Sequence, residues 1–236
     1  MTSRNSQIKG AIKLLRPQFL LAYSIVGIGG IIFGYVQIHL FPNLFLILYS
    51  FIPLLLAGMG VHLRNEAVDW MAGYDREHGG MGVIRDGIFS ARRVKMAGII
   101  LIVPAFLIAL LQIWWNWILL VVAIPMGLVI IFSDYIGARK AGIREVVIAS
   151  SYWGSFMWLY IGQGWTITPA IWIISIFVLM IVFALVPYQD IGDYSADLKS
   201  GKRTLVVAVG LDKTGILCIF VALISLLFLY LGIILL

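Results

Sequence analysis

The sequence predicts an all-α protein, a polytopic bundle of transmembrane helices. Hydrophobic residues make up 62% of the 236 positions and charged residues only 12%, well below the roughly 25% of charged residues in soluble domains. The apolar residues form long runs, and a bilayer-spanning helix needs about 20 residues. Within these runs apolar and polar residues do not alternate as in the strands of a membrane β-barrel, so helices are the expected spanning structure.

Seven apolar runs are long enough to cross the membrane. They cover residues 19–38, 43–62, 96–115, 117–133, 146–162, 168–187 and 214–236. The first run is too long for the apolar part of a signal peptide and lacks a small-residue cleavage site, so we expect it to be the first membrane helix. We expect one domain over residues 1–236. A weak repeat in the order of helices and charged loops indicates two pseudo-equivalent halves, at about 1–133 and 134–236.

The charged residues are confined to one set of connections. All 17 Lys and Arg and all 11 Asp and Glu lie in residues 1–18, 63–95, 134–145 and 188–213. Because positive residues stay on the cytoplasmic side, we expect the N-terminus and these three loops to be cytoplasmic and the C-terminus to lie outside. The net charge of +6 is then explained by topology and anionic lipids, and it does not predict nucleic-acid binding.

Two acidic clusters each follow an apolar run. Asp193 and Asp197 are four residues apart, so in a helix both carboxylates share one face and can share a divalent cation. Asn65 and Asp69 repeat this spacing, and Asp75 follows six residues later. Carboxylates at the end of a membrane helix are candidates for function, whereas isolated acids such as Asp86, Asp134 and Asp212 are interpreted as solvated loop charges.

Paired acidic clusters on one membrane face predict chemistry on a diphosphate. Mg²⁺ is usually held by one or two carboxylates together with substrate phosphates, and Mn²⁺ is an alternative ion. A diphosphate site that opens into a membrane bundle fits a lipid substrate, whose allylic C–O bond ionises in a cavity shielded from water. Nearby cations are expected to neutralise the remaining phosphate charge. These are Arg76, Lys140, Lys202 and Arg203.

The motifs are similar to those of a known family. Gly73 stands two residues before Asp75, and the second cluster reads D193-Y-S-A-D197-L-K-S-G-K-R-T-L. Further similar segments are Arg16-Pro17, G79-G-M-G-V-I-R-D-G-I-F-S90, and Tyr135 followed by G142-I-R-E145-V. On these residues the chain resembles the UbiA family of intramembrane aromatic prenyltransferases over nearly its whole length, and most of all its menaquinone-pathway branch, the dihydroxynaphthoate prenyltransferases.

The resemblance implies a set of site residues. The implied metal and diphosphate ligands are Asn65, Asp69, Asp75, Asp193 and Asp197, of which Asp69, Asp193 and Asp197 are implied to be catalytic. The substrate-binding set is Arg76, Tyr135, Lys140, Gln189, Asp190, Lys202 and Arg203. Two departures stand out: Glu66 replaces a usual Asp and is left out of the ligand set, and Gln189-Asp190 replaces an Asn-Asn pair. The family usually has nine helices, so two helices are missing from this sequence or the protein is a compact relative.

The expected function is Mg²⁺-dependent transfer of a prenyl chain from an isoprenyl diphosphate to a small aromatic acceptor, such as a dihydroxynaphthoate or a hydroxybenzoate. The expected enzyme is an integral protein of the cell membrane that works among lipids, with its active site opening at the cytoplasmic face. Two alternatives remain open. One is prenyl transfer to a glycerol-phosphate lipid precursor, and the other is a non-catalytic protein that binds isoprenoid diphosphates.

Overall fold

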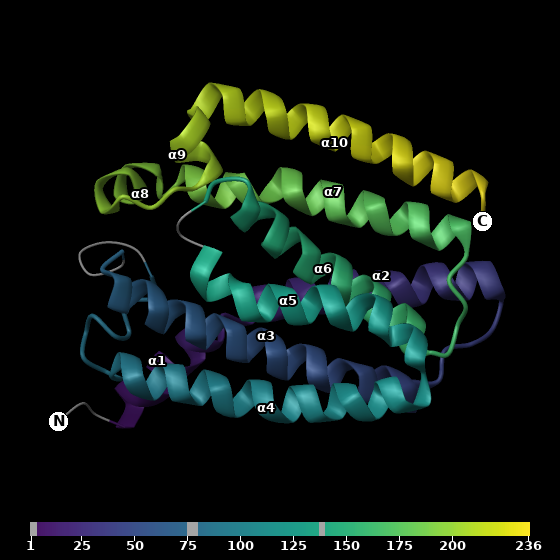
Figure 1. The fold of residues 1–236 in the computed structure, drawn as a ribbon, viewed down its shortest axis with the longest axis horizontal. Coiled ribbons are helices and arrows are strands. Elements are labelled where there is room, and N and C mark those ends of the chain that lie inside the picture. The colour runs from purple at the N-terminus through teal and green to yellow at the C-terminus, as the bar shows by residue number, and fades with distance from the viewer. Residues whose placement is uncertain (1–3, 75–79, 137–139) are drawn as a thin grey trace.

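The computed structural model describes residues 4–74, 80–136 and 140–236, apart from the side chains of 132–136. The described residues form helices and connecting turns, with no strand among them (Figure 1). The helices are α1 (Arg4–Leu15), α2 (Pro17–Ile38), α3 (Leu44–Ala72), α4 (Ala91–Trp115), η1 (Trp117–Leu119), α5 (Leu120–Ile136), α6 (Ile143–Gly162), α7 (Pro169–Ile191), α8 (Tyr194–Ser200), α9 (Leu205–Val209) and α10 (Leu211–Ile234).

The predicted fold class is confirmed. Each of the seven apolar runs corresponds to one long helix, namely α2, α3, α4, α5, α6, α7 and α10, and the fourth run also includes η1. Five helical segments of the described chain are long and apolar enough by themselves to cross a membrane, and Trp117–Ile131 is a shorter apolar helix. The structure is therefore an all-helical membrane bundle, and the count of seven spans stays a prediction.

The N-terminal polar segment was expected only as a charged connection, but it forms a helix of its own, α1. α1 ends directly before Arg16, which has left-handed backbone angles (φ 48°, ψ 60°). A proline disfavours the α conformation in the residue before it, and Pro17 then occupies the first position of α2, where its missing N–H is not needed. The Arg16-Pro17 pair thus separates α1 from the first membrane helix.

α6 forms the centre of the bundle. Its side chains from Phe156 to Ile161 are almost completely buried, and it packs against α2, α5 and α7. α3 pairs with α4, and α7 pairs with α10, so two helical hairpins flank the centre (Figure 1). α2 and α6 approach each other closely, because a Cβ on Gly30 would overlap the carbonyl oxygen of Phe156.

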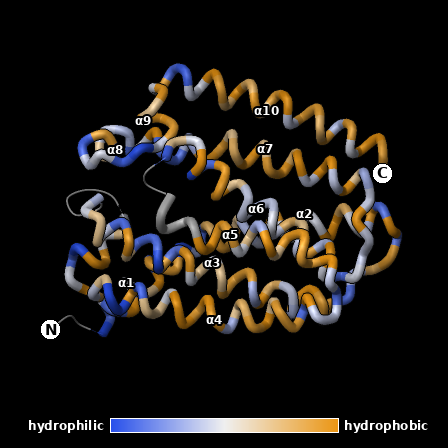
Figure 2. Tube along the Cα trace, viewed as in Figure 1, coloured by the Kyte–Doolittle hydropathy of each residue, from blue (hydrophilic) through white to orange (hydrophobic). Residues whose placement is uncertain are grey.

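The hydrophilic residues are concentrated at one end of the bundle. Figure 2 shows this end with α1, α8 and the loops that lead into α4 and α10. At the opposite end, neutral amides hold the turns: the Asn116 side chain donates to the carbonyl of Ile161 (2.8 Å), and Gln112 donates to the carbonyl of Tyr49 (2.7 Å). The ends of α3 and α7 that carry the acidic clusters both lie at the hydrophilic end (Figure 1).

The α2–α6 contact gives a test of the packing. Gly30→Ala should lower the stability by about 1–3 kcal/mol, because the added methyl group has to displace backbone atoms of α6. Gly29→Ala is the matched control, since its Cβ would lie 3.9 Å from the nearest Phe156 ring atom. Thermal unfolding of the detergent-solubilised variants measures both effects. Equal melting temperatures for the two variants would contradict this helix contact.

Candidate functional site

An ion pair joins the two acidic clusters. Lys202 Nζ lies 3.4 Å from Asp69 Oδ2, with side chains 15% and 26% exposed. Lys202 follows Gly201, whose positive φ of 74° ends α8, and the Lys202 N–H donates to the carbonyl of Asp197 (3.0 Å). The turn after α8 therefore carries this lysine from the second cluster to the first.

The second cluster has the predicted spacing of one helical turn. Asp193 precedes α8, and its carbonyl accepts a hydrogen bond from the Asp197 N–H (2.8 Å). The two carboxylates differ in burial, because Asp193 is exposed and Asp197 is 8% exposed. Burial raises the pKa of the Asp197 carboxyl above its ordinary value, and the nearby Lys202 ammonium acts in the opposite direction.

The first cluster presents Asn65 and Asp69 one turn apart on α3. Asn65 Oδ1 is buried and accepts no hydrogen bond from any described residue. One turn earlier on the same helix, His62 Nε2 is also buried without a described partner, and so is Nε of Arg16. Buried polar atoms are nearly always hydrogen-bonded, so these three atoms are available to a ligand; Gln112, Trp158 and Gln163 have buried atoms in the same condition elsewhere in the bundle.

Glu66 lies beside Asn65 in the sequence but has a different environment. Its carboxylate is buried and accepts hydrogen bonds from the Arg16 side chain (2.9 Å) and from the Met81 N–H (2.6 Å). These contacts hold the start of α2 and the 80–89 loop against α3. The structure thus gives Glu66 a framework role.

A second buried carboxylate organises the other cluster. Glu145 is completely buried and accepts hydrogen bonds from the N–H groups of Gly142 (2.7 Å) and Leu205 (3.1 Å). Its neighbour Arg144 forms an ion pair with Asp190 at the end of α7. These contacts join α6, α7 and α9 next to the second cluster.

Arg144 and Glu145 were quoted in the family motif but were not included among the predicted site residues. An adjacent Arg-Glu pair at the start of an apolar helix is a signal for such a charge network, because isolated charges are disfavoured there. Asp190, predicted to bind substrate, has Arg144 as its direct partner in the structure. The Arg144–Asp190 pair therefore joins α6 to the end of α7, next to Asp193.

The other predicted residues are less closely connected. Lys140, Gln189 and Arg203 are exposed, and within the described part of the chain they form no salt bridge or side-chain hydrogen bond with either cluster. Asp75 and Arg76 lie outside the described residues. Tyr135 belongs to α5, but its side chain also lies outside them.

The oxygen donors of the two clusters fit Mg²⁺. Asn65, Asp69, Asp193 and Asp197 supply amide and carboxylate oxygens, which this ion prefers, and the Asn65 oxygen is unpaired among the described residues. Within those residues no three His, Cys, Asp or Glu side chains are grouped closely enough to hold a metal alone. Two of the donors lie on α3 and two at α8, and this division suits a metal that is also bound by the phosphates of a ligand.

A comparison with family profiles identifies the relationship. The profile of the UbiA prenyltransferase family matches residues 20–236. The chain belongs to this family. As a UbiA member it is an integral membrane prenyltransferase, and its apolar helices agree with that assignment.

Two solved structures share the UbiA fold of this chain. One is a UbiA homologue from Archaeoglobus fulgidus bound to GPP and Mg²⁺, with a TM-score of 0.79 and 15% identity over 96% of this chain and 78% of that one. The other is a UbiA homologue from the same organism bound to DMAPP and Mg²⁺, with a TM-score of 0.72 and 15% identity over 95% of this chain and 84% of that one. No curated protein matches the chain in sequence.

The framework role of Glu66 can be tested by substitution. Glu66→Ala should lower the free energy of unfolding by about 3 kcal/mol, because it leaves a partly buried Arg16 and the Met81 N–H without their acceptor. Asp86→Ala is the control, since Asp86 and Arg85 form an exposed pair (3.5 Å) and its loss should cost less than about 0.5 kcal/mol. Chemical denaturation in detergent measures both. A Glu66→Ala protein as stable as the control would show that the buried pair does not hold the loop.

Proposed function

We propose that this UbiA-family protein transfers a prenyl chain from an isoprenyl diphosphate to a small aromatic acceptor, with Mg²⁺ held between the two acidic clusters. The ion pair between Asp69 and Lys202 carries the proposal. It places a carboxylate of the first cluster beside the basic turn of the second, within reach of one diphosphate. The ligands of the two Archaeoglobus fulgidus structures, GPP and DMAPP with Mg²⁺, support the same substrate class.

The proposed ligand set divides between two walls. Asn65 and Asp69 on α3 form one wall and Asp193 and Asp197 around α8 form the other, with Asp75 added to the first wall from the sequence motif. Lys202 and Arg203 carry positive charge for the diphosphate oxygens, and Arg76 is added on sequence grounds. When bound, Mg²⁺ neutralises the diphosphate as a leaving group. The chain holds the diphosphate at the polar end, and the apolar bundle keeps water from the prenyl carbon.

An aromatic acceptor is favoured by the side chains next to the first cluster. The ring of His62 lies 5.3 Å from Phe19 and 6.1 Å from Tyr23, and Tyr23 lies 4.3 Å from Tyr152. The nitrogens of His62 and Arg16 that lack a partner in the described part of the chain lie in the same region, since the Arg16 guanidinium is 5.9 Å from the Phe19 ring. Aromatic faces beside polar nitrogens suit an aromatic hydroxy acid such as a dihydroxynaphthoate. This supports the menaquinone-type reaction over a glycerol-phosphate acceptor.

The proposed topology places the reaction at the cytoplasmic face. Both acidic clusters lie at the end of the bundle where the hydrophilic segments gather (Figure 2). The basic residues Lys9, Lys13, Arg92 and Arg93 belong to segments at this end, and positive residues favour the cytoplasmic side. We assign the N-terminus and the charged loops to the cytoplasm, and residues 1–236 to one domain with two pseudo-equivalent halves.

Substitution of the carboxylates tests the site. Asp69→Asn and Asp193→Asn should each reduce kcat by orders of magnitude and leave folding intact, because the amide keeps the size but removes the negative charge that holds the metal. Asp212→Asn is the control, as Asp212 is an exposed acid in the first turn of α10. Steady-state assays with geranyl diphosphate measure turnover. If all three variants keep wild-type turnover, the site is elsewhere and the non-catalytic alternative becomes the better explanation.

Metal dependence is a separate prediction. Geranyl diphosphate should bind only in the presence of Mg²⁺ or Mn²⁺, because carboxylates on both walls repel a bare diphosphate. Calorimetry of the detergent-solubilised protein, with and without EDTA, measures this affinity. An affinity that does not change in EDTA would remove the bridging-metal arrangement.

The acceptor position is tested at His62. His62→Leu should raise KM for the aromatic acceptor by about tenfold, the equivalent of one hydrogen bond to the ligand, and leave KM for the prenyl diphosphate unchanged. His39→Asn is the control, since His39 is exposed and its left-handed backbone (φ 57°) tolerates Asn. The assay compares dihydroxynaphthoate, hydroxybenzoate and glycerol phosphate. Turnover of glycerol phosphate alone would overturn the aromatic assignment.

A further inference from the structure

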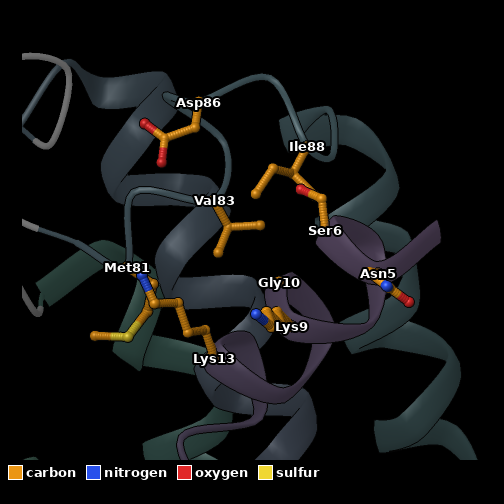
Figure 3. Close-up of a pocket in the computed structure, with 9 residues that line it drawn as sticks. All are labelled: Asn5, Ser6, Lys9, Gly10, Lys13, Met81, Val83, Asp86 and Ile88. Atoms are coloured by element: carbon orange, nitrogen blue, oxygen red, sulfur yellow. The ribbon is translucent and has the colours of Figure 1, made fainter. Parts of the chain in front are cut away.

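A cleft lies between α1 and the 80–89 loop, apart from the two acidic clusters. It encloses about 400 Å³. α1 lines it with Asn5, Ser6, Lys9 and Lys13, and the loop lines it with the apolar side chains of Met81 and Val83 among others (Figure 3). The cleft therefore combines a polar and basic wall with an apolar one.

The two walls are packed together at the base of the cleft. Gly10 and Leu14 form the buried face of α1. A Cβ on Gly10 would lie only 3.0 Å from the Ile88 side chain and 3.3 Å from Val83, so the helix lies directly on the loop. Leu14 belongs to the same apolar cluster as Val83. This packing fixes the position of the basic wall.

The basic wall is suited to an anion. Lys9 and Lys13 are exposed and one helical turn apart, and no carboxylate among the described residues forms a salt bridge with either. Asp86 also lines the cleft, but it pairs with Arg85 (3.5 Å), which balances its charge. The net positive charge of the cleft fits a phosphate group, to which lysine is a common ligand.

The exposed side of α1 is suited to a membrane. Ile8 and Ile12 are 52% and 55% exposed and form an apolar stripe next to the two lysines. α1 leads within one turn into α2, where Leu21 is 62% exposed on the outer surface of the bundle. α1 therefore lies where the membrane begins, with a basic stripe beside an apolar one, as in helices that lie in the bilayer interface.

We propose that this cleft binds the headgroup of an anionic phospholipid. Lys9 and Lys13 contact the headgroup phosphate, and Ile8 and Ile12 contact its acyl chains, which a free phosphate ion does not provide. Both walls are anchored to Glu66, through Arg16 at the end of α1 and through Met81 in the loop. A bound lipid therefore holds together the two segments that support the first acidic cluster.

The test follows the melting temperature of the detergent-solubilised protein as phosphatidylglycerol is added to the micelles. The wild type should be stabilised by phosphatidylglycerol and much less by phosphatidylcholine. Lys9→Gln/Lys13→Gln should weaken the apparent affinity for phosphatidylglycerol by about thirtyfold, because each basic residue near an anionic surface contributes about 1 kcal/mol. Arg92→Gln/Arg93→Gln removes the same charge from exposed positions of α4 outside the cleft and should keep the wild-type affinity.

Three results would overturn the lipid site. They are equal stabilisation by the two lipids, equal loss of affinity in both double variants, and stabilisation by inorganic phosphate alone that matches that of phosphatidylglycerol. The single variants Lys9→Gln and Lys13→Gln are measured in parallel, so that each lysine is tested even if the double variant does not fold. Because the readout is binding, the result is independent of the proposed transfer reaction.

Discussion

A carboxylate buried among membrane helices needs a partner, and this requirement organises the polar end of the bundle. Removal of a charge from water costs several kcal/mol unless close hydrogen bonds replace the lost hydration. Glu66 meets the requirement through Arg16 and the Met81 N–H, and Glu145 through two backbone N–H groups. Each of these acids joins segments that are far apart in the sequence. The loops around the acidic clusters therefore depend on two carboxylates that are not proposed to touch substrate.

The acids at this end fall into two groups with different bonding. Glu66 and Glu145 accept close hydrogen bonds from fixed groups, so their positions are set by the fold. Asp69 instead faces the Lys202 ammonium at 3.4 Å, and both side chains are partly exposed. A compact ammonium on a flexible stem can be displaced by a divalent cation without leaving a charge buried alone. The difference in bonding thus separates acids that build the site from acids that remain open to a ligand.

The sequence was sufficient for the helices and for part of the site. The apolar runs predicted the long helices, because hydropathy and length alone determine which segments fill a bilayer. The spacing of Asp193 and Asp197 likewise predicted their one-turn relation. The pairing of Arg144 with Asp190 was not predicted, since it depends on how α6 and α7 cross. α1 was missed because its polar, basic residues carry no long apolar run.

Which atoms of the site lack a hydrogen-bond partner cannot be predicted from the sequence. Asn65 and His62 each have a buried atom without a partner among the described residues, and this becomes visible only once the helices around α3 are placed. A sequence shows that an amide is present, but whether its oxygen has a donor is a property of the folded chain. Burial without a partner is therefore the feature of this site that the sequence did not provide.

The glycine contact between α2 and α6 also sets an order of events during synthesis. Gly30 leaves room only for the backbone of α6, and α6 is not complete until Gly162 has been made. At about 5–20 residues per second, the ribosome needs on the order of ten seconds to extend the chain from the end of α2 to the end of α6. During this interval the glycine face of α2 lies against lipid or against the insertion machinery. The α2–α6 contact can therefore form only after α3, α4 and α5 have all been synthesised.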